Sequence, residues 1–213
     1  MKPLRLALLG FGTVGQWLAE ALHARRAWLQ QEYGVVVTLV SVGTRHHGLI
    51  YRSDGLDIPT LLDLVATRQP LTAYPPVTHW TNALEGLQVT GGDVLAEATG
   101  ATLRSGEPGL SYIRAALSQG MHVVTSSEGP MALAGLELLS LARTQSVQLR
   151  MESTVMSGTP PCSVPSAKGW QEPGSVLCGH PQRHGELHPQ CHGTGSHLRR
   201  STRAGLCRSR PNR

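Results

Sequence analysis

Short apolar segments alternate with amphipathic ones between Met1 and Pro160. Residues 4–9 form an apolar run, and residues 35–42 are almost continuously aliphatic and β-branched. Such runs predict strands that are covered on both faces of a parallel sheet. Between them, an apolar face with a four-residue spacing predicts one helix that ends at Gly34. This face consists of Val14, Leu18 and Leu22, with Trp17 and Ala21 beside them.

The alternation continues as far as residue 154. The pattern predicts helices at 60–67, 108–119 and 131–144, strands at 93–98, 122–125 and 147–154, and a proline-rich loop at 70–76. Pro108 suits the first turn of a helix, and Gly120 suits the end of one. Strands that alternate with helices in this way predict an α/β fold with a Rossmann-like, doubly wound parallel sheet.

Composition changes sharply after Pro160. Residues 1–160 carry 11 Lys and Arg against 12 Asp and Glu, whereas residues 161–213 carry 8 against 2. The later segment holds all four cysteines and five of the ten histidines, but no Phe, no Ile and only six Leu or Val. Such a low aliphatic content cannot bury a core. We therefore expect a folded domain over 1–160 and a disordered, basic, Cys/His-rich tail over 161–213.

The sequence has no secretory signal pattern and no apolar run of transmembrane length. A secretory signal would need a basic start, a long apolar stretch and a small-residue cleavage site, and residues 1–9 run directly into glycine instead. We expect a cytoplasmic protein that does not associate with membranes.

A glycine-rich loop, Gly10-Phe11-Gly12-Thr13-Val14-Gly15, joins the first predicted strand to the first predicted helix. In such a loop Gly10 permits a tight turn, Gly12 lets the backbone approach a pyrophosphate, and Gly15 allows the helix to pack closely on the strand. The helix N-terminus then faces the negative charge of the ligand. A purely structural turn is the alternative, but the strand-loop-helix context favours dinucleotide binding.

No carboxylate follows the second predicted strand, where many dinucleotide-binding domains hold the adenosine ribose. The residues there are Val42-Gly43-Thr44-Arg45-His46-His47. Arg45 could instead receive a 2′-phosphate, which favours NADP over NAD, although NAD remains possible. A solvated surface arginine is the alternative interpretation.

Several later motifs resemble the homoserine dehydrogenase family. They are DVLAEATG at 93–100, GEP at 106–108, AAL at 115–117, GMHVVTS at 120–126, GP at 129–130 and ESTVMSGTP at 152–160. Together with GFGTVG at 10–15 they follow the family's order and spacing over residues 4–160. The resemblance implies reversible hydride transfer between NAD(P)H and the aldehyde of aspartate semialdehyde, which gives homoserine, in the biosynthesis of threonine and methionine.

The resemblance also implies site residues. Thr99 and Gly100 would line the nicotinamide side of the cleft, with Ser126 and the position of Glu128 beside the cofactor. A sodium ion would be bound by the Glu152 carboxylate and by backbone oxygens of Val155, Ser157 and Thr159. A buried, hydrogen-bonded glutamate at a strand end is the alternative interpretation of Glu152.

Two departures from the family pattern bear on activity. Glu128 stands where the family usually has a lysine, so that a cation near the cofactor becomes an anion. At 4 Å and an effective dielectric constant near 20, a unit-charge pair is worth about 4 kcal/mol, and exposure to solvent screens most of this. The second departure is the end of the resemblance at Pro160, before the substrate domain that carries the family's catalytic lysine, so we assign no retained catalytic residue.

The tail has the features of an out-of-frame translation. The family continues for a short stretch after Pro160 to a motif like GILNGTxNFIL, and Gly179 follows Pro160 at the matching distance in this sequence. Read one nucleotide downstream, the codons of residues 179–189 admit the family residue at each restricted position; these positions are His180, Gln182, His184, Glu186 and His188. We therefore expect a reading-frame shift just after Pro160, natural or from sequencing.

The same expectation accounts for two other features of the tail. Its histidines and cysteines are spaced like metal ligands, and its basic residues resemble a nucleic-acid patch. We expect no nucleic-acid binding, and a metal-binding tail is a minor alternative. The main expectation is a homoserine dehydrogenase with little or no turnover as written, and the rival is a non-catalytic NADP-binding remnant. The oligomeric state stays open, because the family pairs through the substrate domain.

Overall fold

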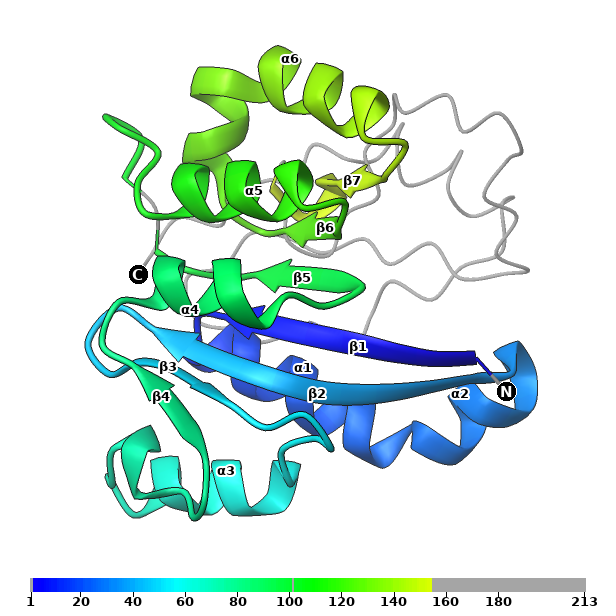
Figure 1. The fold of residues 1–213 in the computed structure, drawn as a ribbon, viewed down its shortest axis with the longest axis vertical. Coiled ribbons are helices and arrows are strands. Elements are labelled where there is room, and N and C mark those ends of the chain that lie inside the picture. The colour runs from blue at the N-terminus through cyan, green and yellow to red at the C-terminus, as the bar shows by residue number, and fades with distance from the viewer. Residues whose placement is uncertain (1, 101, 155–213) are drawn as a thin grey trace, which may run out of the picture. The chain divides into compact units, whose positions relative to one another are not determined.

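The described residues, 2–100 and 102–154 of a computed structural model, form a seven-stranded sheet between two layers of helices (Figure 1). The strand order is β4-β3-β2-β1-β5-β6-β7. Five strands run parallel, namely β1 (Lys2–Leu9), β2 (Val35–Thr44), β5 (Val94–Glu97), β6 (His122–Thr125) and β7 (Leu149–Arg150). The α/β, Rossmann-like fold class is therefore confirmed.

One edge of the sheet is antiparallel, and the sequence pattern did not predict it. β3 (Gly48–Tyr51) pairs with the end of β2, and β4 (Thr78–Trp80) pairs with β3. Gly48 closes the turn with a φ of +68°, where any side chain would meet the Trp80 carbonyl oxygen. Helix α4 (Ala83–Thr90) follows β4 and was also not predicted.

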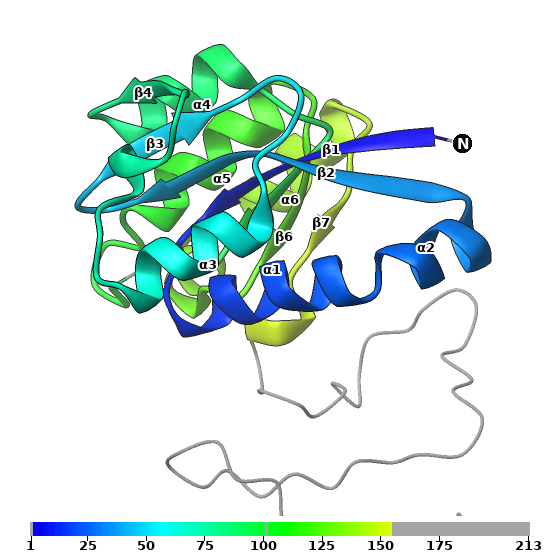
Figure 2. The ribbon, with the colours of Figure 1, turned by 90° about the horizontal axis from the view of Figure 1, so that it is seen from below.

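The two faces of the sheet are covered by different helices (Figure 2). One layer holds α1 (Thr13–Ala24), α2 (Arg26–Tyr33) and α3 (Ile58–Ala66), followed by the 3-10 turn Leu71–Ala73. The other holds α4, α5 (Gly109–Ser118) and α6 (Glu128–Thr144). Alternate residues of β1 enter the two cores, since Leu6 and Leu8 pack with the α1–α3 layer, and Ala7 and Leu9 with the α4–α6 layer. This double coverage accounts for the continuous apolar runs.

The single helix predicted up to Gly34 is wrong in two respects. The helix is interrupted at Arg25, whose φ and ψ are −99° and 12°, so that α1 and α2 are separate helices. The apolar face is also rotated, because Val14 is 55% exposed and Trp17 67% exposed, whereas α1 buries Gly15 and Ala19. Gly34 does end α2 in the left-handed conformation.

The last predicted elements also differ from the structure. The strand predicted over 147–154 is wrong, since β7 contains only Leu149–Arg150 and a 3-10 turn, Glu152–Thr154, follows it. Helix α6 begins three residues earlier than predicted and is kinked at Ala134. Val155, Ser157, Thr159 and the tail at 161–213 lie outside the described residues, so the predictions made for them stay predictions. No helix of the described residues combines the length and apolar character needed to cross a membrane.

Candidate functional site

The loops that follow β1, β5 and β6 meet at the carboxyl edge of the sheet. The amide of Gly10 donates a hydrogen bond of 2.9 Å to the Gly43 carbonyl, and the amide of Ala98 one of 2.7 Å to the Leu9 carbonyl. β1 lies between β2 and β5, and the chain continues from β1 into a helix on one face and from β5 into a helix on the other. Open α/β sheets bind ligands at such a switch point.

The three glycines of the loop have different surroundings. A Cβ on Gly10, whose φ is +96°, would lie 2.3 Å from the Ala98 carbonyl oxygen, and one on Gly15 would lie 2.0 Å from the Gly10 carbonyl oxygen. Packing therefore requires glycine at both positions. A Cβ on Gly12 would have no described atom within 4 Å. The described residues do not fill this space, which fits the approach of a pyrophosphate.

The N-terminus of α1 opens onto the same space. Gly12 is the N-cap residue, so no side chain caps the helix, and the first turn has no acidic residue. Thr13 and Val14 are exposed. The first amides of a helix lack partners within it and carry a partial positive charge, which suits a phosphate. Phe11 has a different role from its neighbours, because its side chain is buried in the core and its carbonyl accepts a hydrogen bond of 2.9 Å from Gln16.

A cavity of about 710 Å³ lies at the end of β2. Arg45 is exposed and lines it, so its guanidinium is accessible to a ligand there. Glu85, in the first turn of α4, lines the same cavity and provides a carboxylate that the sequence analysis missed. The remaining lining residues are Thr44, His79, Trp80, Thr81, Asn82, Ala83 and Tyr112. Only the fold brings Glu85 to Arg45, since the two lie far apart in the sequence.

Tyr112 of α5 links this cavity to the centre of the edge. Burial raises the pKa of the Tyr112 phenol, the charges of Glu97 and Glu107 raise it further, and Arg45 acts in the opposite direction. The charges of Glu97, Glu107 and Arg45 therefore all act on this phenol.

Glu97, the last residue of β5, is the centre of a buried hydrogen-bond network and is 1% exposed. Its Oε1 accepts hydrogen bonds from the amide of Thr99, at 2.8 Å, and from the Thr99 hydroxyl. Its Oε2 accepts one of 2.5 Å from the hydroxyl of Thr125, whose oxygen accepts the Ser127 amide. The Ser127 hydroxyl lies 3.0 Å from Oε1 and 2.7 Å from the Thr99 carbonyl oxygen. The network thus fixes the loops after β5 and β6 relative to each other.

The residues expected beside the nicotinamide lie around this network. Thr99 is half-buried and Gly100 exposed, with no described atom within 4 Å of a Cβ built on Gly100. Ser126 is half-buried and its amide donates a hydrogen bond of 3.0 Å to the Glu97 carbonyl. Glu128 is exposed at the start of α6, where a carboxylate is stabilised by the helix dipole. Its charge is therefore screened by solvent.

Glu152 is the described part of the expected sodium site. Its side chain is 46% exposed and lies 3.7 Å from Arg150. The alternative of a buried, hydrogen-bonded glutamate is therefore wrong. Within residues 2–100 and 102–154, no three His, Cys, Asp or Glu side chains are grouped as metal ligands. The sodium site stays a prediction.

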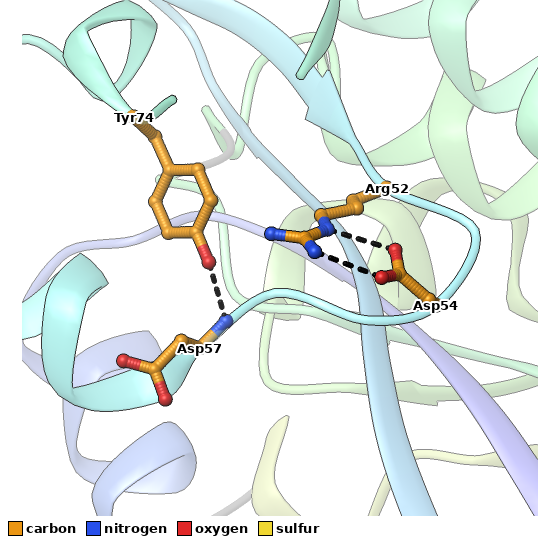
Figure 3. Close-up of polar contacts among 4 residues, drawn as sticks. All are labelled: Arg52, Asp54, Asp57 and Tyr74. Atoms are coloured by element: carbon orange, nitrogen blue, oxygen red, sulfur yellow. Dashed lines mark hydrogen bonds and ion pairs between the residues drawn. The ribbon is translucent and has the colours of Figure 1, made fainter. Parts of the chain in front are cut away.

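A second cavity, of about 370 Å³, borders the amino-terminal half of β2 and the loop after β3. Arg52 and Asp54 form a bidentate ion pair in this loop, with both contacts at 2.8 Å (Figure 3). The buried Tyr74 hydroxyl accepts a hydrogen bond of 2.7 Å from the Asp57 amide. Hydrogen bonding by Arg52 lowers the pKa of Asp54. These contacts hold the loop in place, and none of the predicted site residues lines this cavity.

Comparison with curated proteins gives consistent relatives over about three quarters of the chain. The chain is 38% identical over 160 residues to an NAD(+)-dependent homoserine dehydrogenase of Pseudomonas canavaninivorans, which is 75% of this chain and 46% of that protein. It is 26% identical over 155 residues to a homoserine dehydrogenase of Methanocaldococcus jannaschii, again 46% of that protein. The chain thus spans less than half the length of these relatives. No family model matches it.

Solved structures give the same result. A putative homoserine dehydrogenase from Archaeoglobus fulgidus has a TM-score of 0.60 at 30% identity, over 74% of this chain and 44% of that one. A hyperthermophilic archaeal homoserine dehydrogenase in complex with NADPH has a TM-score of 0.61 at 25% identity, over 75% of this chain and 46% of that one. The region of resemblance includes the carboxyl edge described above.

Proposed function

We propose that this chain, which over about 75% of its length matches the N-terminal NAD(P)-binding domain of homoserine dehydrogenases, binds a nicotinamide dinucleotide at the carboxyl edge of its sheet. The open space over Gly12, at the uncapped N-terminus of α1, carries this proposal. The backbone of the loop holds the pyrophosphate, and Arg45 receives a 2′-phosphate, which favours NADP(H).

The reaction proposed for the domain when it is joined to a substrate domain is the reversible interconversion of homoserine and aspartate semialdehyde, for which a bound cofactor would supply or accept the hydride. The Thr99 and Ser126 loops position the nicotinamide, and Glu97 keeps both loops in register through Thr99, Thr125 and Ser127. Homoserine and the semialdehyde are the substrates to test, because the relatives are homoserine dehydrogenases.

A second candidate is cofactor binding without turnover. It is favoured by Glu128, an exposed anion at the position where the resemblance places a lysine. The two candidates share the binding step and differ in catalysis, so binding is tested first.

Gly12→Ala tests the site. The substitution meets no described atom, and Gly12 has a negative φ of −82°, so the fold should keep its melting temperature. The added methyl group occupies the space of the pyrophosphate, so binding of NADPH and NADH by the full chain should weaken at least about tenfold, measured by calorimetry. Gly135→Ala in α6 is the matched control, since its Cβ would lie 3.4 Å from the flexible end of Met131. Equal binding by Gly12→Ala and the unchanged chain would disprove the site.

A further inference from the structure

The cavity at the end of β2 is lined by two opposite charges, and the proposed function places the adenosine ribose of the cofactor beside it. Arg45 and Glu85 both line it, and none of the three ion pairs of the described residues joins them. We propose that Glu85 is a specificity-determining residue that opposes Arg45 at the ribose 2′ position, so that the cavity accepts both NAD(H) and NADP(H). This inference rests on the proposed function.

Packing and hydrogen bonding fix the position of Glu85. The side-chain oxygen of Asn82 caps α4 by accepting a 2.9 Å hydrogen bond from the Leu84 amide, and its Nδ2 donates one of 3.2 Å to Glu85 Oε1. Glu85 Oε2 accepts no hydrogen bond from the described residues. One turn of α4 is anchored on the sheet, because a Cβ on Gly86 would lie 3.1 Å from side-chain atoms of Leu49 and Trp80. The free carboxylate oxygen is therefore available at the cavity.

Arg45 lies in the turn between β2 and β3. The Thr44 hydroxyl oxygen accepts a hydrogen bond of 3.0 Å from the His47 amide, and the His47 carbonyl lies 2.9 Å from Nε2 of His79. These contacts fix the turn without using the Arg45 guanidinium, whose charge acts on the Tyr112 phenol. The cation and the carboxylate thus reach one cavity from two elements, the β2–β3 turn and α4.

The two charges have opposite effects on the two cofactors. A 2′-phosphate is attracted by Arg45 and repelled by Glu85, whereas the free ribose hydroxyls of NAD(H) can donate hydrogen bonds to a carboxylate. A carboxylate at this place therefore weakens the binding of NADP(H) and strengthens the binding of NAD(H). The alternative role of Glu85 is to complete the capping box of α4 with Asn82, a role that glutamine also fills.

Glu85→Gln separates these roles, because it removes the charge and keeps the cap. Dissociation constants for NADPH and NADH are measured by calorimetry on the full chain at one fixed, low ionic strength. NADPH should bind about tenfold more tightly and NADH a few-fold less tightly than in the unchanged chain, an effect that salt diminishes. Arg45→Gln should shift the NADH-to-NADPH ratio of dissociation constants the other way. Glu32→Gln, in exposed α2, is the charge-matched control and should leave the ratio unchanged.

The outcomes separate this inference from the proposed function. An unchanged ratio in Glu85→Gln, with both cofactors bound, shows that Glu85 only caps α4 and overturns the inference. Failure of the unchanged chain to bind either cofactor overturns the proposed function. If Glu85→Gln lowers the melting temperature, Glu85→Asp provides a second measure. This variant retains the charge, so the ratio of the NADH and NADPH dissociation constants should stay close to that of the unchanged chain. A tenfold shift in Glu85→Asp would overturn the inference as well.

Discussion

Glu97 shows how much of the site depends on a single buried side chain. Its carboxylate accepts hydrogen bonds from the Thr99 amide and from the hydroxyls of Thr99 and Thr125. The Thr125 oxygen also accepts a hydrogen bond of 3.0 Å from the Ser127 amide, while its hydroxyl proton goes to Glu97. A carboxylate accepts from all of these donors. A group that donates at the place of Oε1 would face the Thr99 amide, and one that donates at the place of Oε2 would leave the Thr125 hydroxyl proton without its acceptor.

We therefore expect Glu97→Gln to destabilise the protein. The amide NH2 of glutamine would face a donor at Thr99 or Thr125, which leaves a buried polar group unsatisfied at a cost of about 1–3 kcal/mol. Urea unfolding of the full chain measures this loss, and NADPH affinity should also fall because the Thr99 and Ser127 loops lose their common anchor. Glu20→Gln, at an exposed position in the middle of α1, is the control and should change the free energy of unfolding by less than about 0.5 kcal/mol. Equal stability of the two variants would contradict the role given to Glu97.

At the level of single residues, the sequence predicted those site residues whose role depends only on their neighbours in the chain. Gly10, Gly12 and Gly15 could be assigned because the strand, the loop and the helix follow one another in the chain. Glu85 and Glu97 could not. The role of Glu97 depends on pairing between β5 and β6, and that of Glu85 depends on an antiparallel hairpin that places α4 beside the end of β2.

The elements missed by the sequence analysis share one physical reason. β3 and β4 contain four and three residues, too few to show a period, and they form an antiparallel extension after a turn whose only signal is Gly48. β1 and β2, of eight and ten residues, were predicted because burial on both faces of the sheet gives them long apolar runs, and α5 and α6 because they are long enough to show a helical period. The strand predicted at β7 was too long, since the chain leaves the sheet after Arg150 and forms the 3-10 turn Glu152–Thr154.

Asp57 is the N-cap residue of α3, and it makes the stability of the protein depend on pH. Asp57 accepts hydrogen bonds from the Thr60 amide at 3.0 Å and from the Thr60 hydroxyl at 2.6 Å. These bonds, the hydroxyl first, lower the pKa of Asp57. Because the folded pKa lies below the unfolded value of about 3.9, the stabilisation is present above about pH 4 and is lost as the pH falls through the folded pKa.

Asp57→Ala should therefore cost about 0.5–1 kcal/mol of unfolding free energy at pH 7. The difference from the unchanged chain should shrink as the pH falls from about 5 to about 3, because protonation removes the negative charge of Asp57. Urea unfolding at both pH values tests this. Asp63→Ala, in the same helix but away from its start, is the control and should show no such pH dependence. A cost that stays constant down to pH 3 would contradict the assignment of the cap.

At the scale of the whole molecule, no lysine of the described residues lies beside the carboxyl edge of the sheet, where we propose that the cofactor binds. The sequence contains only two lysines, Lys2 and Lys168. Lys2 begins β1, at the opposite end of the strand from Gly10, and Lys168 lies outside the described residues. The chain spans 46% of the length of its relatives from Pseudomonas and Methanocaldococcus. We therefore expect cofactor binding by this chain without catalysis.

We predict that the full chain binds NADPH but shows no homoserine-dependent reduction of NADP+ above background. Glu128→Lys alone should not restore turnover, because the resemblance ends at Pro160, before the family's substrate domain that would hold homoserine and move its hydroxyl proton. A chain re-encoded in the frame one nucleotide downstream after Pro160 should gain activity, and Glu128→Lys should raise it further. The two changes should be strongly non-additive, since a cation beside the cofactor lowers the barrier only when a substrate is held there. Turnover by the unaltered chain that Gly12→Ala abolishes would contradict the prediction and show that other residues of this chain carry out the chemistry.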